Sequence, residues 1–224
     1  MVHPFMFLDW LAELVNLHVG EHVLYTWLAM AILLSVAWLA GRNVALVPGR
    51  MQNFMESVIA GFDGLIESVM GKEGKPYFPL IATIGMFVLV SNLLGLVPAC
   101  YPPTANLNTN AALALTVFTM THYIGIQRHG FGYVKHFMGP ILWLAPLMFI
   151  IEILSHLVRP ISLSLRLFGN MYGKEIVLMI FFALVPLFLP IPIMVLGILI
   201  SMIQTFVFVL LSMIYIAGAI EEAH

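Results

Sequence analysis

Arg166 and Glu175 are the residues whose types and spacing could do chemistry in this sequence. Arg166 lies in the run Ser162-Leu-Ser-Leu-Arg-Leu-Phe-Gly-Asn-Met-Tyr172, and Glu175 follows nine residues later. A guanidinium cannot lose its proton in a protein, whereas a carboxyl group can gain and lose one. The pair therefore combines a fixed cation with a titratable acid, the two kinds of charge that are costly to bury in an apolar chain.

The spacing of the polar residues around Arg166 predicts how a helix would present them. At about 100° per residue, Ser162, Arg166 and Asn170 share one face, and Glu175 lies about half a turn round on the opposite face. Glu152, fourteen residues before Arg166, is offset from the arginine face by only about 40°. One helix should thus carry a fixed cation on one side and a titratable acid on the other.

Each of these residues also has a plainer interpretation. Arg166 could snorkel to the lipid headgroups, and Asn170 could make an interhelical hydrogen bond, although an intramembrane arginine favours a function. Glu175 could pair with its neighbour Lys174. Glu152 could pair locally with His156 four residues on, and these two lack the third and fourth ligands of a metal site.

Further polar residues are scattered through other apolar stretches. Gln204 is the strongest polar group of the last stretch and could join two helices. Asn92, Asn106 and Asn108 could line a wet vestibule or cap helices. His122 could carry protons, but an interfacial histidine usually does not.

Composition places these residues in a membrane. Of 224 residues, 62% are hydrophobic and only 9% are charged, which predicts an integral membrane protein. The net charge of −2 and the unclustered basic residues predict no nucleic-acid partner. The single cysteine, Cys100, excludes an internal disulfide and a cysteine metal cluster.

The hydrophobic pattern predicts an all-α protein with about five membrane-crossing helices and one interfacial amphipathic helix. The predicted crossings are residues 24–40, 79–98, 111–127, 140–189 and 191–220. About 20 apolar residues suffice to cross the hydrocarbon, so the last two must be strongly tilted, and residues 140–189 could bend or break at Pro160. Apolar residues spaced by three and four predict an amphipathic helix over residues 48–70.

Basic residues predict the orientation, because short loops that hold Lys and Arg stay in the cytoplasm. Such residues occur in the first and third connections, at Arg42, Arg50, Lys72, Lys75, Arg128 and Lys135. Residues 1–23, which lack the pattern of a cleaved signal, are then a retained extracytoplasmic segment. A single crossing by residues 140–189 puts the C-terminus in the cytoplasm, and we favour it because a double crossing leaves Arg159 outside.

The residues match one family closely. The run Pro160-Ile-Ser-Leu-Ser-Leu-Arg-Leu-Phe-Gly-Asn-Met-Tyr-Gly-Lys-Glu175, followed by Gln204-Thr-Phe-Val-Phe-Val-Leu-Leu-Ser-Met-Ile-Tyr215, resembles subunit a of the F-type ATP synthase. The resemblance extends to residues 91–98 and 104–108, and covers the chain from the amphipathic helix to the C-terminus.

This resemblance implies a non-catalytic stator subunit in a bacterial inner membrane, without a cofactor of its own. Its partners would be the ring of c subunits, the b-subunit peripheral stalk, the rest of the complex and the lipid bilayer, and its cargo a proton or sodium ion. The essential cation corresponds to Arg166, and the ion path to Asn170, Glu175, Gln204 and Glu152. Weaker candidates for the channel lining are Asn92, Ser162, Asn106 and Asn108.

Two departures from the family leave the channel lining open. Gly197 stands where relatives often carry a histidine, and Asn106 where they often carry an aspartate. The alternative function is a secondary ion transporter, which would usually show an internal repeat, and we find none. The sequence also has no phosphate-binding glycine loop, so nucleotide chemistry would belong to other subunits.

Overall fold

The computed structural model describes residues 20–42, 44–97, 100–130, 133, 145–184 and 190–220. Across these ranges the regular structure is helical, which confirms the predicted all-α class. The helices are α2 (Glu21–Gly41), α3 (Arg50–Met70), α4 (Phe78–Leu94), α5 (Leu107–His129), α7 (Ala145–Leu184) and α8 (Pro190–Ile220), with short 3-10 helices η1 (Gly71–Tyr77) and η2 (Pro103–Ala105). Most of the predicted N-terminal segment 1–23 lies outside the described residues, as do 140–144 and 185–189.

Within the described ranges, four helical segments are long and apolar enough to cross a membrane, compared with about five crossings predicted for the whole sequence. They are Glu21–Gly41, Arg50–Leu94, Pro146–Leu184 and Pro190–Ile220. The predicted crossing at residues 111–127 falls within α5, which is not among the four. Asparagine, threonine, histidine and glutamine interrupt the apolar residues of α5, and α5 packs against α7 and α8. Its polar groups therefore face other helices as well as their surroundings.

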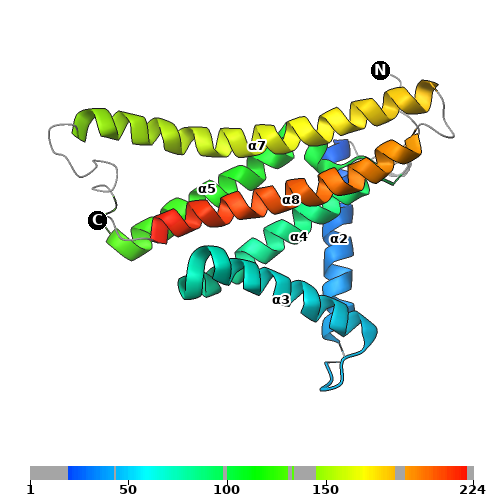
Figure 1. The fold of residues 1–224 in the computed structure, drawn as a ribbon, viewed down its shortest axis with the longest axis horizontal. Helices are drawn as coiled ribbons and strands as arrows, with labels where there is room; N and C mark the ends of the chain where they lie inside the picture. The colour runs from blue at the N-terminus through cyan, green and yellow to red at the C-terminus, as the bar shows by residue number, and fades with distance from the viewer. Residues whose placement is uncertain are drawn as a thin grey trace.

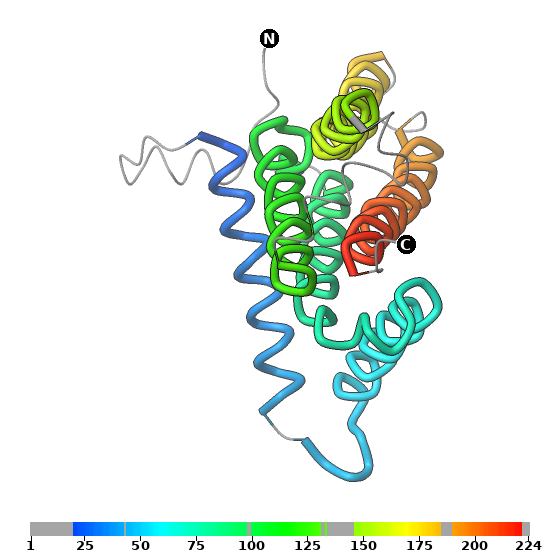
Figure 2. The backbone as a smooth tube through the Cα atoms, turned by 90° about the vertical axis from the view of Figure 1, so that its left-hand side faces the viewer, coloured from blue at the N-terminus to red at the C-terminus, as the bar shows by residue number. Residues whose placement is uncertain are grey.

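The two long helices α7 and α8 run antiparallel along the long axis of the molecule (Figure 1). Seen from the side, α7 is viewed nearly end-on, whereas α2 runs down the view (Figure 2). Helix α2 thus lies at a steep angle to the long helices, whereas α4 and α5 run obliquely in the same general direction as α8 (Figure 1). Helix α7 continues for 40 residues with Pro160 inside it, so the proline does not break the helix.

The amphipathic helix α3 uses only part of its apolar stripe within the chain. Ile66 is fully buried, and Phe62, Leu65 and Val69 pack against the same cluster, which includes residues of α4 and α8. Toward the start of the helix, Phe54 is 58% exposed. The second half of α3 therefore fixes it to the helix bundle, and the first half leaves apolar surface uncovered.

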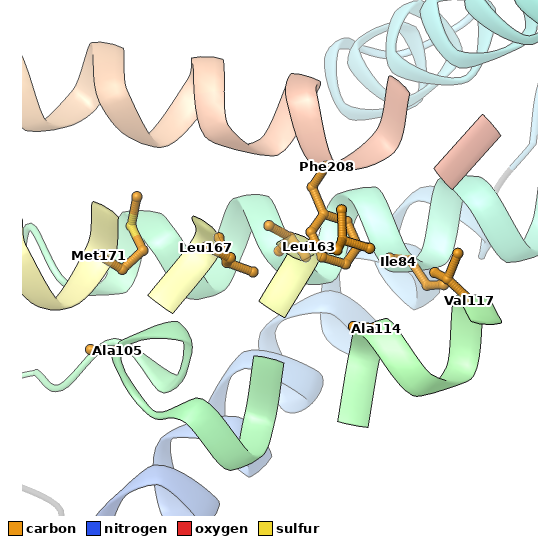
Figure 3. Packing of buried hydrophobic residues seen from close by; sticks show 9 residues of the cluster. Ile84, Ala105, Ala114, Val117, Leu163, Leu167, Met171 and Phe208 are labelled. Carbon is orange, nitrogen blue, oxygen red and sulfur yellow. The ribbon is translucent and has the colours of Figure 1, made fainter. Parts of the chain in front are cut away.

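The core lies where α4, α5, α7 and α8 meet, and η2 closes one side of it (Figure 3). Its buried members are Ile84, Val88, Ala105, Ala114, Val117, Leu163, Leu167, Met171 and Phe208. Lipid tails are as apolar as these side chains, so close packing and interhelical hydrogen bonds, more than removal from water, hold such helices together.

The two ends of the bundle differ in charge. At the end that we call the basic end, Arg128 of α5 pairs with Glu73 of η1 at 3.2 Å, and Lys72 and His129 line a crevice with Ile220 of α8. The opposite end contains the connection from α4 to α5, residues 95–106, which has no charged side chain. The two ends provide the reference for placing the candidate site.

Gly85 should be the position in α4 least tolerant of a side chain. A Cβ atom there would lie 2.8 Å from ring carbons of Phe62 in α3 and 2.8 Å from a methyl group of Val209 in α8. We expect Gly85→Ala to lower the stability of the purified protein in detergent by about 1–3 kcal/mol through overpacking, measured by thermal unfolding. The matched control is Gly64→Ala, since nothing lies within 4 Å of a Cβ atom there. Equal transition temperatures for the two variants would contradict the packing of α3, α4 and α8.

Candidate functional site

Arg166 lies on the exposed face of α7, near the middle of the helix. Large apolar side chains are exposed near it on α7, with Ile161 55% and Leu165 50% exposed. Its Nη2 atom is 3.5 Å from the hydroxyl oxygen of Ser162, which accepts a weak hydrogen bond. Among the described residues, no carboxylate lies within ion-pair distance of Arg166. The guanidinium charge is thus directed outward from an apolar surface, where an anion from outside the chain could meet it.

Asn170 and Gln204 join α7 to α8 one turn beyond Arg166. The Asn170 amide Nδ2 donates a hydrogen bond to Oε1 of Gln204, and Gln204 is only 4% exposed. The plainer interpretation of both residues as interhelical contacts therefore holds in the structure. The contact also fixes the rotation of α7 about its axis, and with it the direction in which Arg166 points.

Lys174 and Glu175 do not form the ion pair that their adjacency allowed. Consecutive helical residues point about 100° apart, and Lys174 is directed into the bundle, where it is 7% exposed. Its ammonium donates to the carbonyl oxygen of Asn92 at 3.2 Å and to the hydroxyl oxygen of Ser201 at 3.4 Å. The Glu175 carboxyl group has a buried oxygen, Oε2, with no hydrogen-bond partner in the described part of the chain.

Asn92 is the centre of a buried hydrogen-bond network at the end of α4. Its side-chain amide donates to the hydroxyl oxygen of Thr205 at 3.2 Å, and its Oδ1 accepts from the Thr104 hydroxyl at 2.7 Å. The Thr104 carbonyl oxygen in turn accepts from the amide of Asn110 at 2.7 Å. Asn92 is completely buried, so it ties α4, η2, α7 and α8 together.

The other two weaker candidates behave as a helix cap. The Oδ1 atom of Asn106 accepts a hydrogen bond from the backbone N–H of Asn108 at 2.9 Å, at the start of α5. The Asn108 residue is exposed. Of the alternatives left open by the sequence, capping is the one the geometry shows for Asn106.

Gly197 makes room for Lys174. A Cβ atom at Gly197 would lie 3.3 Å from Cδ of Lys174 and 2.7 Å from a methyl group of Leu96. The lysine stem therefore passes over the glycine on its way to Asn92. The lack of a side chain at Gly197 of α8 thus leaves the space that the long side chain of Lys174 in α7 occupies.

Glu152 forms a second charged group, toward the other end of α7. Its Oε1 atom is 3.2 Å from Nε2 of His156, as the spacing of four residues allowed, and 3.9 Å from Nη2 of Arg159. The Arg159 guanidinium lies over the ring of Tyr215 in α8, 5.2 Å from its centroid. This group includes Glu152, which was predicted from the sequence as a site residue, and Arg159 and Tyr215, which were not.

His156 also contacts α5, which sequence reasoning did not find. Its ring centroid is 5.2 Å from that of His122, and Nδ1 of His122 is 3.0 Å from the hydroxyl oxygen of Tyr133. His122 and His156 are 34 positions apart in the sequence. No periodicity within either helix indicates that the two rings meet.

Buried polar atoms without partners occur mainly at the end opposite to the basic end. Among the described residues they are Ser91 Oγ, Asn110 Oδ1, Glu175 Oε2 and His129 Nε2. The first three come from the α4 end, the α5 start and the part of α7 beside them. Buried polar atoms in native proteins usually form hydrogen bonds with protein or with ordered water. The unpaired atoms at this end therefore offer hydrogen-bonding sites for water.

Tyr101, in the connection between α4 and α5, lies in the same region. Its hydroxyl donates to the carbonyl oxygen of Ala105 at 3.2 Å. Burial, together with the negative charges of Glu21 and Glu175, raises the pKa of Tyr101 to about 12. Tyr101 therefore remains a neutral hydroxyl group at physiological pH, close enough to both carboxylates to feel their charge.

Comparison with known proteins identifies the family of the chain. The sequence family described as ATP synthase A chain matches residues 23–217. The chain belongs to this ATP synthase A chain family. It is 58% identical to ATP synthase subunit a 3 of Pelobacter propionicus, 60% to ATP synthase subunit a 2 of Syntrophotalea carbinolica and 59% to ATP synthase subunit a of Geobacter sulfurreducens, each over the full length of both chains.

Membership of the ATP synthase A chain family confirms the resemblance drawn from the Arg166 and Gln204 motifs. The relatives are bacterial, and the described part of the chain has four helical segments of membrane-spanning length and composition. Together these support a bacterial inner membrane protein that takes part in ATP synthesis and proton transport. The candidate site then consists of Arg166 at the surface of α7 with a polar group toward each end of the helix.

The Asn92 network gives a prediction about how the site is held. We expect Asn92→Ala to lower the thermal stability of the purified protein by about 1–3 kcal/mol, because the buried partners Thr104 and Thr205 lose their hydrogen bonds. Asn108→Ala is the matched control. Asn108 is exposed, and the substitution keeps the backbone N–H that donates to Oδ1 of Asn106. An unfolding temperature for Asn92→Ala equal to that of the control would show that the network does not hold the helices.

Proposed function

We propose that the chain is the ion-translocating stator of an F-type ATP synthase membrane sector, with Arg166 standing between two polar routes. The name shared by the relatives, ATP synthase subunit a, supports its place in that complex. The single observation that carries the arginine's role is its position on an exposed apolar face of α7. A charge in such a place is costly unless an anion meets it.

The partner that fits this surface is a rotating ring of c subunits. Each c subunit would bring one carboxylate to the membrane-exposed face of α7, where it meets the Arg166 guanidinium. A fixed cation favours the ionised form of a carboxylate within a few ångströms. The other partners we propose are the b-subunit peripheral stalk, the remaining subunits of the complex and the surrounding lipid.

The first route enters at the end opposite to the basic end and reaches Glu175. Its support is the set of buried polar atoms of Ser91, Asn110 and Glu175 that have no partner in the described part of the chain. Waters in protein interiors typically make about three hydrogen bonds to such atoms. Because basic loops stay in the cytoplasm, this end faces outward, with the N-terminus outside and the C-terminus in the cytoplasm.

The second route leaves from Glu152 toward the basic end. The Glu152 side chain is 33% exposed, and its spacing from Arg166 keeps it within about 40° of the arginine face. It can therefore meet the same ring surface as Arg166, about 21 Å further along α7 at 1.5 Å per residue. A ring carboxylate that turns past Arg166 would meet Glu152 directly, whereas Glu175, on the opposite face of α7, would serve the first route from inside the bundle.

The coupling then follows from electrostatics. An ion from outside neutralises a ring carboxylate beside the first route, the neutral site turns through lipid, and the ion leaves beside the second. The positive field of Arg166 opposes a cation that would pass straight from one route to the other. One charge that crosses 100 mV yields about 2.3 kcal/mol, so several ions serve each nucleotide, whose chemistry belongs to the other subunits.

Replacing Arg166 should separate ion flow from rotation. We expect Arg166→Ala to abolish ATP-driven proton pumping while passive proton conductance of the membrane sector persists or rises. Arg166→Lys should also lose most of the pumping, because an ammonium lacks the guanidinium fork and can lose its proton in an apolar site. Both are measured in inverted membrane vesicles that contain the assembled complex, with dye quenching as the readout.

The control is Arg42→Ala, since Arg42 lies over the Trp38 ring at the far end of α2, away from α7. This variant should pump as the unmodified complex does. Co-purification of the c ring with each variant shows that the complex has assembled. Coupled pumping at the unmodified rate in Arg166→Ala would refute the proposed role.

A further inference from the structure

A cluster of titratable side chains lies between α7 and α5, apart from Arg166 and Glu175. We define this histidine cluster as Glu152, His156 and Arg159 of α7, His122 of α5 and Tyr133. His156 Nε2 meets Glu152 Oε1 at 3.2 Å, and His122 Nδ1 meets the Tyr133 hydroxyl at 3.0 Å. The two imidazole rings lie 5.2 Å apart between centroids. The contacts thus form a continuous series from one helix to the next.

The series runs from the membrane-exposed surface into the bundle. The side chain of Glu152 is 33% exposed and that of His156 only 9%, and Tyr133 is 7% exposed. His122 lies in the second half of α5, whose last turn reaches the basic end through Arg128. The groups therefore connect the α7 surface, where a ring carboxylate would pass, with the end that carries the basic residues.

The remaining neighbours hold the cluster in place. Arg159 lies 3.9 Å from the same Glu152 oxygen and stacks over Tyr215 of α8, and the ring of Phe118 meets that of His122 edge-on at 4.3 Å. A small cavity between α5, α7 and α8 is bounded by Thr121, His156 and Arg159. The charged and titratable groups that face His156 are thus Glu152 and Arg159 on its own helix and His122 on α5, with Tyr133 beyond His122 and Tyr215 beneath Arg159.

We propose that His156 and His122 relay protons between Glu152 and the basic end, so that the ion on this route is a proton. The inference rests on the proposed function and specifies the chemistry of its second route. Imidazole takes up a proton at one nitrogen and releases one from the other, whereas it offers a sodium ion no such transfer. A chain of imidazoles therefore selects for the proton.

Each transfer is balanced without any further reactant. The proton on Glu152 Oε1 moves to His156 Nε2, and His156 gives up a proton to the His122 ring or to a water beside it. His122 then releases a proton toward the Tyr133 hydroxyl and the basic end. Every step breaks one O–H or N–H bond and forms another. Because each ring accepts at one nitrogen and releases from the other, a rotation of the ring that exchanges the two nitrogens then returns the relay to its starting state. In ATP-driven pumping the same steps run in reverse.

The relay can be distinguished from a merely structural cluster by its pH dependence. In inverted vesicles the bath contacts the basic end, and ATP-driven pumping draws protons from it. A neutral imidazole accepts a proton at one nitrogen and passes one on from the other, whereas uptake without it depends on hydronium, which becomes scarcer as the pH rises. In sodium-free buffer we expect His156→Gln and His122→Gln each to slow pumping about tenfold at alkaline pH and less than about twofold at mildly acidic pH.

The matched control is His129→Gln, the same substitution two turns further along α5, at a residue that is not a member of the histidine cluster. It should pump as the unmodified complex does at every pH. A purely structural cluster would lower pumping by the same factor at all pH values, and this result would overturn the relay. Pumping by both histidine variants at the unmodified rate in alkaline buffer would overturn it too.

Arg166→Ala in the same vesicles separates the two proposals. If Arg166→Ala loses coupling while the histidine variants keep normal alkaline pumping, the relay fails and the stator role stands. If Arg166→Ala pumps normally, the stator role fails first. Should His156→Gln not assemble with the c ring, His122→Gln decides the question, because its position on α5 leaves the Glu152–His156 contact intact.

Discussion

A permanent positive charge on an apolar helix surface is the constraint on which the rest of this structure depends. The guanidinium of Arg166 cannot be neutralised by losing a proton, and the described chain offers it only the hydroxyl of Ser162. An isolated charge in hydrocarbon costs several kcal/mol. The exposed Arg166 charge is therefore stabilised only when another molecule supplies an anion at this surface. The described chain does not supply that anion itself.

A charge held against a moving partner must be held still, and buried polar contacts do this for α7. Asn170 binds Gln204 of α8, and one turn further along nearly the same side of the helix Lys174 binds the Asn92 carbonyl oxygen of α4. Apolar contacts alone specify rotation weakly, because lipid tails compete for the same surfaces. Hydrogen bonds between particular groups do not slide in this way, so they fix where Arg166 points.

The sequence predicted what depends on local pattern and left open what depends on contacts between distant helices. The all-α class was predicted from periodicity, and short spacings offered the pairing of Glu152 with His156 and a cap at Asn106 as alternatives. The structure has all three. The Lys174 contact with Asn92 spans 82 positions, and no local rule indicates it. The adjacent ion pair with Glu175 failed for the same reason, since a distant carbonyl competed for the ammonium.

The length of α7 explains why its two acids can serve different sides of a membrane. A helix of 40 residues is about 60 Å long, twice the roughly 30 Å of hydrocarbon, so it stays within the membrane only if it tilts by about 60°. Glu152 and Glu175, 23 residues apart, are then separated by about 35 Å along the axis, most of it parallel to the membrane plane. Two acids so displaced cannot exchange an ion directly across Arg166. In the proposed role, only a partner that moves laterally can carry an ion between Glu175 and Glu152. Ion transfer between the two acids therefore requires rotation of that partner.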